Sequence, residues 1–264
     1  MPYRELPHVA APGVLLVGGL DPSGGAGFIA DIRIASALGC RPVGVVSALT
    51  DQNTVGVIAA NPADPAVIAN QLSTLLTDVE VAAVKIGMIA SHDIARAVAD
   101  ALALTAAPVV WDPVVAPTRG ATLFEGDLAA AVDALAPHLA LITPNAHEAE
   151  LLTGRRVADA ASAIVAGREL CSRGIPAVLI KGGHLPGDDA VDYLIAGDDA
   201  IALPGPRVPV RESVHGTGCA LATAIACKLA HKIALRAACE QAKLLVAQRL
   251  AAPVSAGRGR ASVV

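Results

Sequence analysis

Six short apolar runs, rich in β-branched residues, recur along the chain at 14–17, 42–46, 82–86, 109–111, 139–142 and 177–180. Runs of this length without polar alternation are typical of strands that are buried on both faces. Between them lie stretches with helical periodicity, at 27–38, 65–76, 91–104, 126–135 and 158–172. The alternation predicts an α/β fold in which a mostly parallel central sheet carries helices on both faces.

The pattern changes after residue 181, where the sequence is rich in Gly, Pro and Asp. Strand-like pieces at 190–195, 200–203 and 207–210 are expected to pair antiparallel, and helices are expected at 216–231 and 233–251. No linker composition and no internal repeat divide the chain. We therefore expect a single domain with its core at about 13–251, a short N-terminal arm and a flexible C-terminal tail.

The composition supports a large core made of aliphatic side chains. Of the 264 residues, 54% are hydrophobic but only 2% are aromatic, and 17% are charged. Disorder is therefore excluded. No apolar run approaches the roughly 20 residues that a membrane span needs, and the first dozen residues lack the apolar core of a signal peptide. We expect a cytoplasmic protein without a membrane partner.

Charge and cysteine usage argue against a nucleic-acid-binding protein and against a protein stabilised by zinc or disulfides. The net charge is −4 without a basic block, and the few aromatic residues are scattered, so nucleic acid is not expected as a partner. The five cysteines contain no CxxC pair, and the seven histidines show no HxxxH spacing. Structural zinc and a disulfide framework are therefore not expected, which points to a reducing compartment.

A glycine-rich turn at 18–27 follows the first predicted strand and holds five glycines. Glycine lets a backbone approach a ligand closely, so this turn is a candidate binding loop. Gly25, Gly27 and Ala30, with Asp51 further on, also fit the dinucleotide pattern GxGxxG/A, which leaves a nicotinamide-dependent oxidoreductase open. A tight turn without a ligand is the remaining interpretation.

A second glycine-rich turn, HGTGC at 215–219, precedes a predicted helix. The backbone N–H groups of Gly216, Thr217, Gly218 and Cys219 can converge at the helix N-terminus and form an anion hole for a transferred phosphoryl group. An ordinary glycine-rich helix start is the alternative. The helix dipole is expected to lower the pKa of Cys219, which would let the thiolate accept a proton from a hydroxyl; a packed cysteine is again the alternative.

Three charged residues follow predicted strands, where the ligand edge of a parallel sheet lies. Lys181 is placed to meet a phosphate, and Asp112 and Glu148 are placed to hold Mg²⁺. Glu148 is equally expected to cap a helix at 148–152. Lys243, in the middle of a predicted helix, is expected from the residues alone to be a solvated surface lysine.

Seven blocks together resemble the hydroxymethylpyrimidine/phosphomethylpyrimidine kinases of thiamine biosynthesis. They are DPSGGAG at 21–27, SALTDQNT at 47–54, VKIGM at 84–88, DPV at 112–114, TPN at 143–145 with Glu148, KGGH at 181–184 and HGTGC at 215–219. The resemblance runs in family order over about 14–245. It implies a ribokinase-like three-layer α/β/α sandwich, a homodimer, and phosphorylation by ATP and Mg²⁺ of 4-amino-5-hydroxymethyl-2-methylpyrimidine and then of its monophosphate.

The resemblance also implies roles for individual residues. Gln52 would read the aminopyrimidine edge, Met88 and Val114 would contact the ring, Gly19 and Ala26 would line the pocket, and Asp31 would support it. The metal and phosphate region is assigned Asp112, Asn145 and Glu148. Lys181 would contact the nucleotide or its loop, and Lys243 would approach the transferred phosphate. Cys219 stands where related sugar kinases carry an aspartate base.

One block departs from the family, because residues 112–120 read DPVVAPTRG where the family often has DPVMVAxSG. Pro117 and Arg119 therefore leave open how this loop moves and how it handles the second phosphate. Three alternatives remain: a pyridoxal-type kinase with the same motifs, the oxidoreductase, and a ligand sensor without catalysis. The oxidoreductase leaves the KGGH and HGTGC blocks unexplained.

Overall fold

The computed structural model describes residues 11–115, 123–183, 185–209 and 214–264, and within them a nine-stranded sheet. The strands lie in the order β3-β2-β1-β4-β5-β6-β7-β8-β9. Six of them are parallel: β1 (Gly13–Leu20), β2 (Arg41–Gln52), β4 (Ala83–Ile86), β5 (Val109–Trp111), β6 (Leu139–Ile142) and β7 (Ala177–Ile180). The antiparallel strands β3 (Val57–Pro62), β8 (Asp192–Ala196) and β9 (Asp199–Leu203) flank them. The predicted mostly parallel sheet is confirmed.

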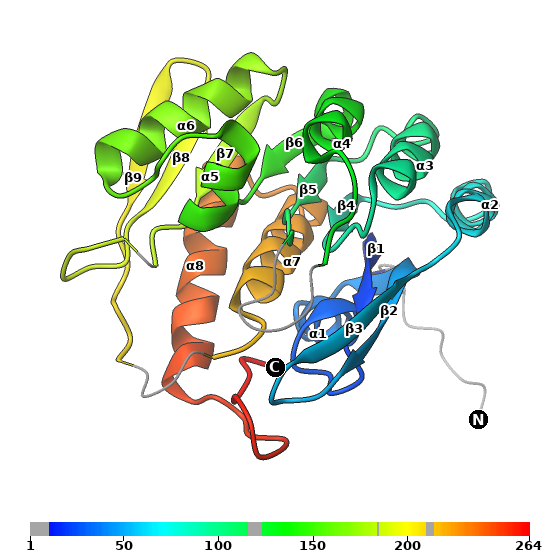
Figure 1. Cartoon of the computed structure of the whole chain (residues 1–264), viewed down its shortest axis with the longest axis horizontal. Helices are drawn as coiled ribbons and strands as arrows, with labels where there is room; N and C mark the ends of the chain where they lie inside the picture. Colours follow the sequence, from blue (N-terminus) through cyan, green and yellow to red (C-terminus); the bar gives the residue numbers. More distant parts are fainter. Residues whose placement is uncertain (1–10, 116–122, 184, 210–213) are drawn as a thin grey trace, which may run out of the picture.

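Helices cover both faces of the sheet (Figure 1). One layer contains α1 (Gly27–Ala37), α7 (Thr217–Ala230) and α8 (Leu235–Ala251). The other contains α2 (Pro65–Leu76), α3 (His92–Leu102), α4 (Leu128–Leu135), α5 (Ala146–Thr153) and α6 (Ala160–Ser172), with a 3₁₀ turn at Ala136–His138. Side chains of β1 alternate between the two cores: Val14 and Leu16 enter the first, Leu15 and Val17 the second. The predicted three-layer α/β/α sandwich is therefore confirmed.

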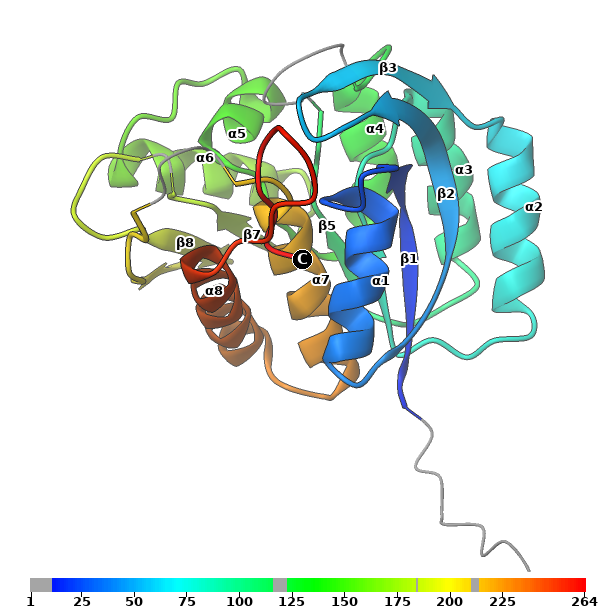
Figure 2. The same cartoon turned by 90° about the horizontal axis from the view of Figure 1, so that it is seen from below.

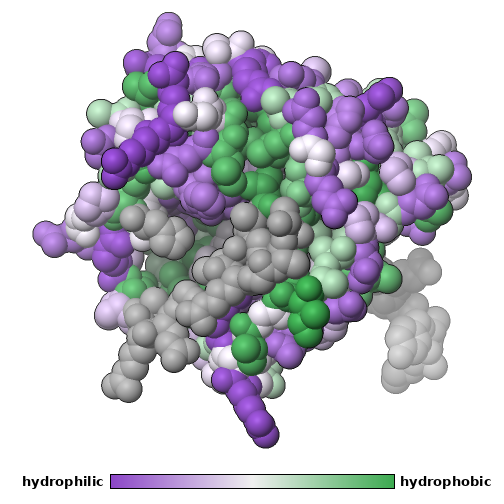
Figure 3. Space-filling view, in the orientation of Figure 1, coloured by the Kyte–Doolittle hydropathy of each residue, from purple (hydrophilic) through white to green (hydrophobic). Residues whose placement is uncertain are grey.

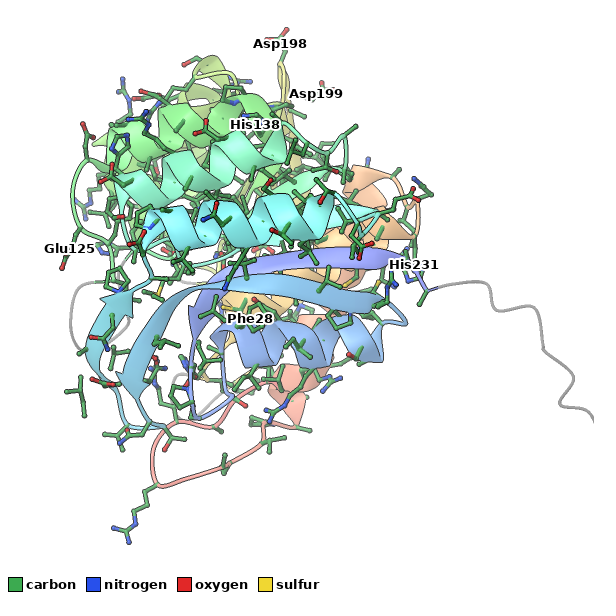
Figure 4. The ribbon with its side chains drawn as sticks, turned by 90° about the vertical axis from the view of Figure 1, so that its right-hand side faces the viewer. Phe28, Glu125, His138, Asp198, Asp199 and His231 are labelled. Atoms are coloured by element: carbon green, nitrogen blue, oxygen red, sulfur yellow. The ribbon has the colours of Figure 1, made fainter. Side chains whose placement is uncertain are left out.

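Local chemistry explains where the outer helices begin. The side chains of Asp64, Ser91, Asp127, Asn145 and Asp159 each accept a hydrogen bond from the first turn of the helix that follows. Such caps satisfy backbone N–H groups that have no partner inside the helix. On the other face, α1 packs closely on β2, because Gly44 leaves room for the ring of Phe28 (Figure 4).

The structure differs from the sequence prediction in two strands. Strand β3 was not expected, because its run VIAANP is short and half-exposed; it forms by pairing with the long strand β2. The strand expected at 207–210 is wrong for residues 207–209, which adopt no strand; residue 210 lies outside the described residues.

The C-terminal tail also differs from its expected flexibility. Val263 is 1% exposed, and residues 254 and 262 are joined by two backbone hydrogen bonds. A parallel bridge also connects Ser262 to His215.

Within the described residues, none of the helices combines the length and the apolar character that crossing a membrane requires.

Candidate active site

The candidate site lies at the edge of the sheet where the parallel strands end. Strands β1, β4, β5, β6 and β7 all run in the same direction, so their carboxyl ends meet there. The residues that follow them are the glycine-rich turn at 21–27, Met88, Asp112, Asn145 and Lys181. An isolated bridge joins Asn145 to Lys181. The predicted common edge is therefore present.

The two glycine-rich turns touch each other at this edge. Gly216 has a φ of +81°, and a Cβ there would lie 2.1 Å from the carbonyl oxygen of Gly25. Only glycine fits both this backbone conformation and this close approach. The contact brings together the N-termini of α1 and α7, which begin at residues 27 and 217. Their partial positive charges favour an anion between them.

A polar network links the turns on the side of Gln52. His215 Nε2 lies 3.1 Å from Asp21 Oδ2 and 3.0 Å from Gln52 Nε2. Thr50 holds the amide of Gln52 through a 3.2 Å hydrogen bond to Oε1. Burial raises the pKa of Asp21, but hydrogen bonds from His215 and Ser23 outweigh it and leave this pKa below its usual range.

The apolar wall expected for an aromatic ring is assembled beside this network. A Cβ at Gly19 would lie 2.9 Å from Met88 Sδ, so the absence of a side chain makes room for the thioether. Met88 is buried, and its carbonyl oxygen accepts a hydrogen bond from Ser47. Ala26 donates its N–H to Asp21 Oδ2 at 3.1 Å. Val114, half-buried, follows Asp112 at the end of β5.

A cluster of opposite charges lies against the second turn. Lys181 Nζ is 2.6 Å from Asp112 Oδ1 and 3.5 Å from Glu148 Oε2. A Cβ at Gly218 would lie 3.1 Å from Asp112 Oδ2 and 3.2 Å from Lys181 Nζ, so a side chain there would fill the cluster. Burial lowers the pKa of Lys181, but Asp112 and Glu148 outweigh it and raise this pKa above its usual range.

Glu148 caps a helix, as one of its two predicted roles requires. It forms a capping box with Asn145 at the start of α5, because each residue accepts a hydrogen bond from the other's backbone N–H. The same carboxylate faces Lys181. Burial raises the pKa of Glu148, although the charge of Lys181 acts in the opposite direction.

The donor atoms in this cluster fit Mg²⁺. Asp112 and Glu148 supply two carboxylates, and Thr143 donates its hydroxyl to Asp112 Oδ1 at 3.3 Å. Magnesium prefers such hard oxygen ligands and usually takes only one or two carboxylates, completing its shell with phosphate oxygens and water. Within the described residues, no group of three or more His, Cys, Asp or Glu side chains forms a complete metal site. A nucleotide would therefore have to share the ion.

Cys219 lies in the first turn of α7, but its expected low pKa is wrong. Burial raises the pKa of the thiol to about 11, although the charge of Lys85 and a backbone hydrogen bond from Gly27 act in the opposite direction. Desolvation disfavours the thiolate more than these contacts favour it. The thiol is therefore protonated near neutral pH in the structure without ligands.

A buried ion pair below Cys219 was missed in the sequence. Lys85 Nζ lies 2.5 Å from Asp31 Oδ2, and both side chains are 1% exposed. Thr223, one turn after Cys219 in α7, donates its hydroxyl to Asp31 Oδ1 at 2.7 Å. The supporting role expected for Asp31 stays a prediction; the contacts of its carboxylate are with Lys85 and Thr223. A lysine inside the apolar run 82–86 was the available signal.

Lys243 is not the surface lysine that its helix suggests. Its side chain is 13% exposed, and Nζ lies 2.7 Å from Asp192 Oδ2. The other oxygen of Asp192 accepts a hydrogen bond from the N–H of Gly182, directly after Lys181. This chain of contacts ties α8 to the same edge. A groove of about 270 Å³ adjoins Lys243 and is lined by 202–206, Arg236, Glu240 and Leu244.

One predicted feature falls outside the described residues, and another lies away from this site. Pro117 and Arg119 lie outside the described residues. Asp51, proposed for dinucleotide binding, is exposed and pairs with Ala59 in the β2–β3 ladder. Asp192 and the side chains of Asp21 and His215 were missed, because a sequence does not show which distant residues meet.

Comparison with known proteins assigns the fold and the family. A family model described as phosphomethylpyrimidine kinase matches residues 21–264. A hydroxymethylpyrimidine/phosphomethylpyrimidine kinase of Rhizobium meliloti is 38% identical over 253 residues, covering 94% of this chain and 95% of that protein. The structure of a phosphomethylpyrimidine kinase from Clostridium difficile is 31% identical, with a TM-score of 0.77, and covers 90% of this chain and 99% of its own.

A pyridoxal kinase is also similar in shape. The Staphylococcus aureus pyridoxal kinase in complex with ADP has a TM-score of 0.88 at 26% identity, covering 97% of this chain and 93% of its own. Its backbone agrees better than that of the Clostridium difficile kinase, whereas its sequence agrees less well. Sequence identity and the match to the family model favour the pyrimidine kinases, because one backbone can serve different activities and its agreement alone does not distinguish them. The chain belongs to the phosphomethylpyrimidine kinase family.

Proposed function

We propose that this protein transfers the terminal phosphoryl group of ATP to the hydroxyl of 4-amino-5-hydroxymethyl-2-methylpyrimidine, and then phosphorylates the monophosphate to the diphosphate. The observation that carries the proposal is the meeting of the two glycine-rich turns beside the Asp112–Lys181 pair. It supports an anion site between the polar network at Gln52 and the cluster of Lys181, Asp112 and Glu148. Phosphoryl transfer depends mainly on such positioning and on charge stabilisation.

The pyrimidine would lie beside Gln52 and Met88. The amide of Gln52 is a donor and an acceptor, so it can pair with an exocyclic amine and a ring nitrogen. Met88, opposite Gly19, offers a polarizable sulfur to the flat ring. A site that hydrogen-bonds its substrate rejects analogues lacking the matching groups, since its own polar atoms would stay unpaired.

The phosphoryl group would pass between the alcohol and the N-terminus of α7. Backbone N–H groups of Gly216, Thr217, Gly218 and Cys219 would stabilise its developing charge. The thiolate of Cys219 would take the proton from the alcohol oxygen, which then bonds to the terminal phosphorus while ADP leaves. Because burial disfavours this thiolate, Lys85 is the nearby cation that offsets part of the penalty.

The nucleotide would lie along the charged cluster. Lys181 and Lys243 would hold its phosphates, and Asn145 would border them at the start of α5. Asp112 and Glu148 would hold Mg²⁺, which neutralises phosphate charge when it is bound. The groove beside Lys243 is large enough to take part of the nucleotide.

A pyridoxal kinase is the second candidate, because the Staphylococcus aureus enzyme shares the fold closely. Comparing kcat/KM for the pyrimidine, its monophosphate and pyridoxal, by coupled measurement of ADP release, tests the choice. We expect the pyrimidine to be preferred and the monophosphate to be accepted. A large preference for pyridoxal would reverse the assignment, and ATP turnover independent of either alcohol would exclude both.

Two further features stay predictions. A homodimer agrees with the exposed apolar side chains of Leu49 in β2, Val55 in the turn after β2, and Ile58 in β3, which is 76% exposed. Exposed apolar residues of this kind often belong to interfaces, and Figure 3 shows apolar patches among mostly hydrophilic residues. A cytoplasmic location is expected from the cysteine content, with all five cysteines unpaired.

A further inference from the structure

The C-terminal segment 254–263, called the strap below, closes on itself and lies beside the site. Val254 and Ser262 exchange two backbone hydrogen bonds of 2.8 Å, so residues 255–261 form a loop. In Figure 2 this loop, drawn in red, lies between the β2–β3 hairpin and the start of α7. Val263 anchors it in the core shared by α1, α7 and α8.

The strap is hydrogen-bonded to the turn between β2 and β3. Arg260 donates its N–H to the carbonyl oxygen of Thr54 at 2.9 Å, and Gly259 donates to Thr54 Oγ1 at 3.0 Å. A Cβ at Gly259 would lie 2.1 Å from the Thr54 carbonyl oxygen, and one at Gly257 would lie 2.6 Å from Thr54 Oγ1. Glycine at these two positions permits the contact, because a side chain there would push the strap away from Thr54.

The strap next holds the second glycine-rich turn. His215 donates its N–H to the carbonyl oxygen of Ala261 at 2.8 Å, and Val263 donates to that of His215 at 3.3 Å. Ser262 also borders Gly25, where a Cβ would lie 3.3 Å from Ser262 Cβ. One short segment therefore joins the first turn, the second turn and the β2–β3 hairpin.

The side chains of Gln52 and His215 belong to the two elements that the strap connects. Gln52 stands at a break in the β2–β3 register, between Asp51 and Gln52, two residues before Thr54. A bulge of this kind aims the side chain according to how the strand is bent. His215 belongs to the second glycine-rich turn, which the strap also contacts, and its Nε2 lies 3.0 Å from Gln52 Nε2. A shift of the hairpin relative to His215 would separate the two.

We propose that the strap is a positioning element for the alcohol substrate: its glycine contacts with Thr54 and its bridge to His215 fix Gln52 at the pyrimidine. This inference rests on the proposed function, because it assigns Gln52 to that substrate. The strap contacts named above do not include Lys181, Lys243 or the groove beside Lys243. The strap therefore sets affinity for the alcohol and leaves affinity for the nucleotide unchanged.

Gly257→Ala tests the proposal, because its methyl group would meet Thr54 Oγ1 at 2.6 Å and Cγ2 at 3.1 Å. We expect KM for the pyrimidine to rise about fivefold or more, while kcat and KM for ATP stay within about twofold of wild type. Ser255→Thr is the matched control, since it adds one methyl group at an exposed position of the same loop. We expect it to match wild type.

A second variant removes the atoms against which Gly257 packs. Thr54→Ala deletes Oγ1 and Cγ2 and with them the bond from Gly259, so it should also raise KM for the pyrimidine. Adding Gly257→Ala to Thr54→Ala should have little further effect, because of the three atoms nearest to the new methyl group only Thr54 Cβ, at 3.4 Å, remains. Such non-additivity is the signature of direct contact between the two positions.

The outcomes separate this proposal from the proposed function. If wild type phosphorylates the pyrimidine and both single variants keep its KM, the strap has no positioning role. Equal rises in KM for ATP and for the pyrimidine, or a lower thermal midpoint with unchanged KM values, would show a purely structural role and overturn the inference. If wild type does not phosphorylate the pyrimidine, the proposed function fails and this inference fails with it.

Discussion

Asp21 Oδ2 lies 3.1 Å from His215 Nε2, although the two residues are 194 positions apart in the chain. Each belongs to one of the two glycine-rich turns, and a Cβ at Gly216 would strike the carbonyl of Gly25. The contact brings the N-termini of α1 and α7 together, where we propose that the phosphoryl group lies. It also holds His215 beside Gln52, so His215 would border both the proposed phosphoryl site and the proposed alcohol site.

Gln52→Ala should weaken binding of the pyrimidine and change kcat much less. The amide accepts a hydrogen bond from Thr50 and lies 3.0 Å from His215 Nε2 in the structure, and it would pair with the substrate in the complex. Losing such a polar contact costs roughly 1–3 kcal/mol, or about 5- to 150-fold in KM. Steady-state kinetics with varied pyrimidine measure it. Asp51→Ala, at the exposed neighbouring position, should keep the wild-type KM; equal effects of both changes would contradict the role of Gln52.

Cys219→Ala should lower kcat by about 10²- to 10⁴-fold, the range of general base catalysis, and affect KM for the pyrimidine little. Cys171→Ala, in the distant helix α6, serves as the control and should leave kcat unchanged. Near-wild-type turnover after loss of the Cys219 thiol would remove it as the base. Backbone N–H groups and substrate geometry would then have to suffice.

The pH dependence gives an independent check on Cys219. Burial raises its pKa to about 11, so the thiolate fraction increases throughout the range from pH 7 to 10. If the thiolate is the base, kcat/KM of wild type should rise with pH across this range. The residual activity of Cys219→Ala should lack that rise. A flat wild-type profile would contradict base catalysis by this residue.

Lys181→Met should lower kcat strongly, because it removes the cation shared by Asp112 and Glu148. Two buried carboxylates would then face each other without compensation. Burial already raises the pKa of Glu148, and losing the opposing charge of Lys181 would let this pKa rise further. Activity should recover partly at higher Mg²⁺ concentration. Titrating Mg²⁺ in the coupled assay measures this. Lys228→Met, at the far end of α7, should behave as wild type.

Lys85→Met should reduce the free energy of unfolding by about 3–5 kcal/mol, because Asp31 would be left as a buried, unpaired carboxylate. Urea unfolding at fixed pH measures the loss. Adding Asp31→Asn should restore part of it, since the neutral amide can still accept the hydrogen bond from Thr223. Full destabilisation in the double variant would show that the charge of Asp31 is not the cause.

The stability lost in Lys85→Met should depend on pH, and the pKa of Asp31 sets the direction of this dependence. Burial raises the pKa of Asp31 even in wild type, and removing Lys85 raises it further. A carboxyl whose pKa is higher folded than unfolded stabilises the protein most below its unfolded pKa, and this contribution is lost as pH rises through the folded pKa. The deficit of Lys85→Met relative to wild type should therefore be smaller at pH 5 than at pH 8.

The sequence predicted the parallel strands and their helices because each signal is local. Buried strands such as 177–180 are apolar on both faces, and helix α2 begins at an Asp64 cap followed by proline. Strand β3 escaped notice because its run is half-exposed and becomes a strand only by pairing with β2. The tail from 255, polar and rich in glycine, suggested flexibility, since its partners Thr54 and His215 are distant in sequence.

For the site, residue types and motif order identified Asp112, Lys181 and the HGTGC turn, because strand ends of a parallel sheet share one edge. The pKa of Cys219 is raised, and not lowered as the helix position predicted, because burial outweighs the helix dipole. The sequence by itself thus determined the layers, the catalytic edge and the family. Only the tertiary structure decided the pairings Asp21–His215, Lys85–Asp31 and Lys243–Asp192. These contacts depend on how helices pack across the sheet, which short-range patterns do not encode.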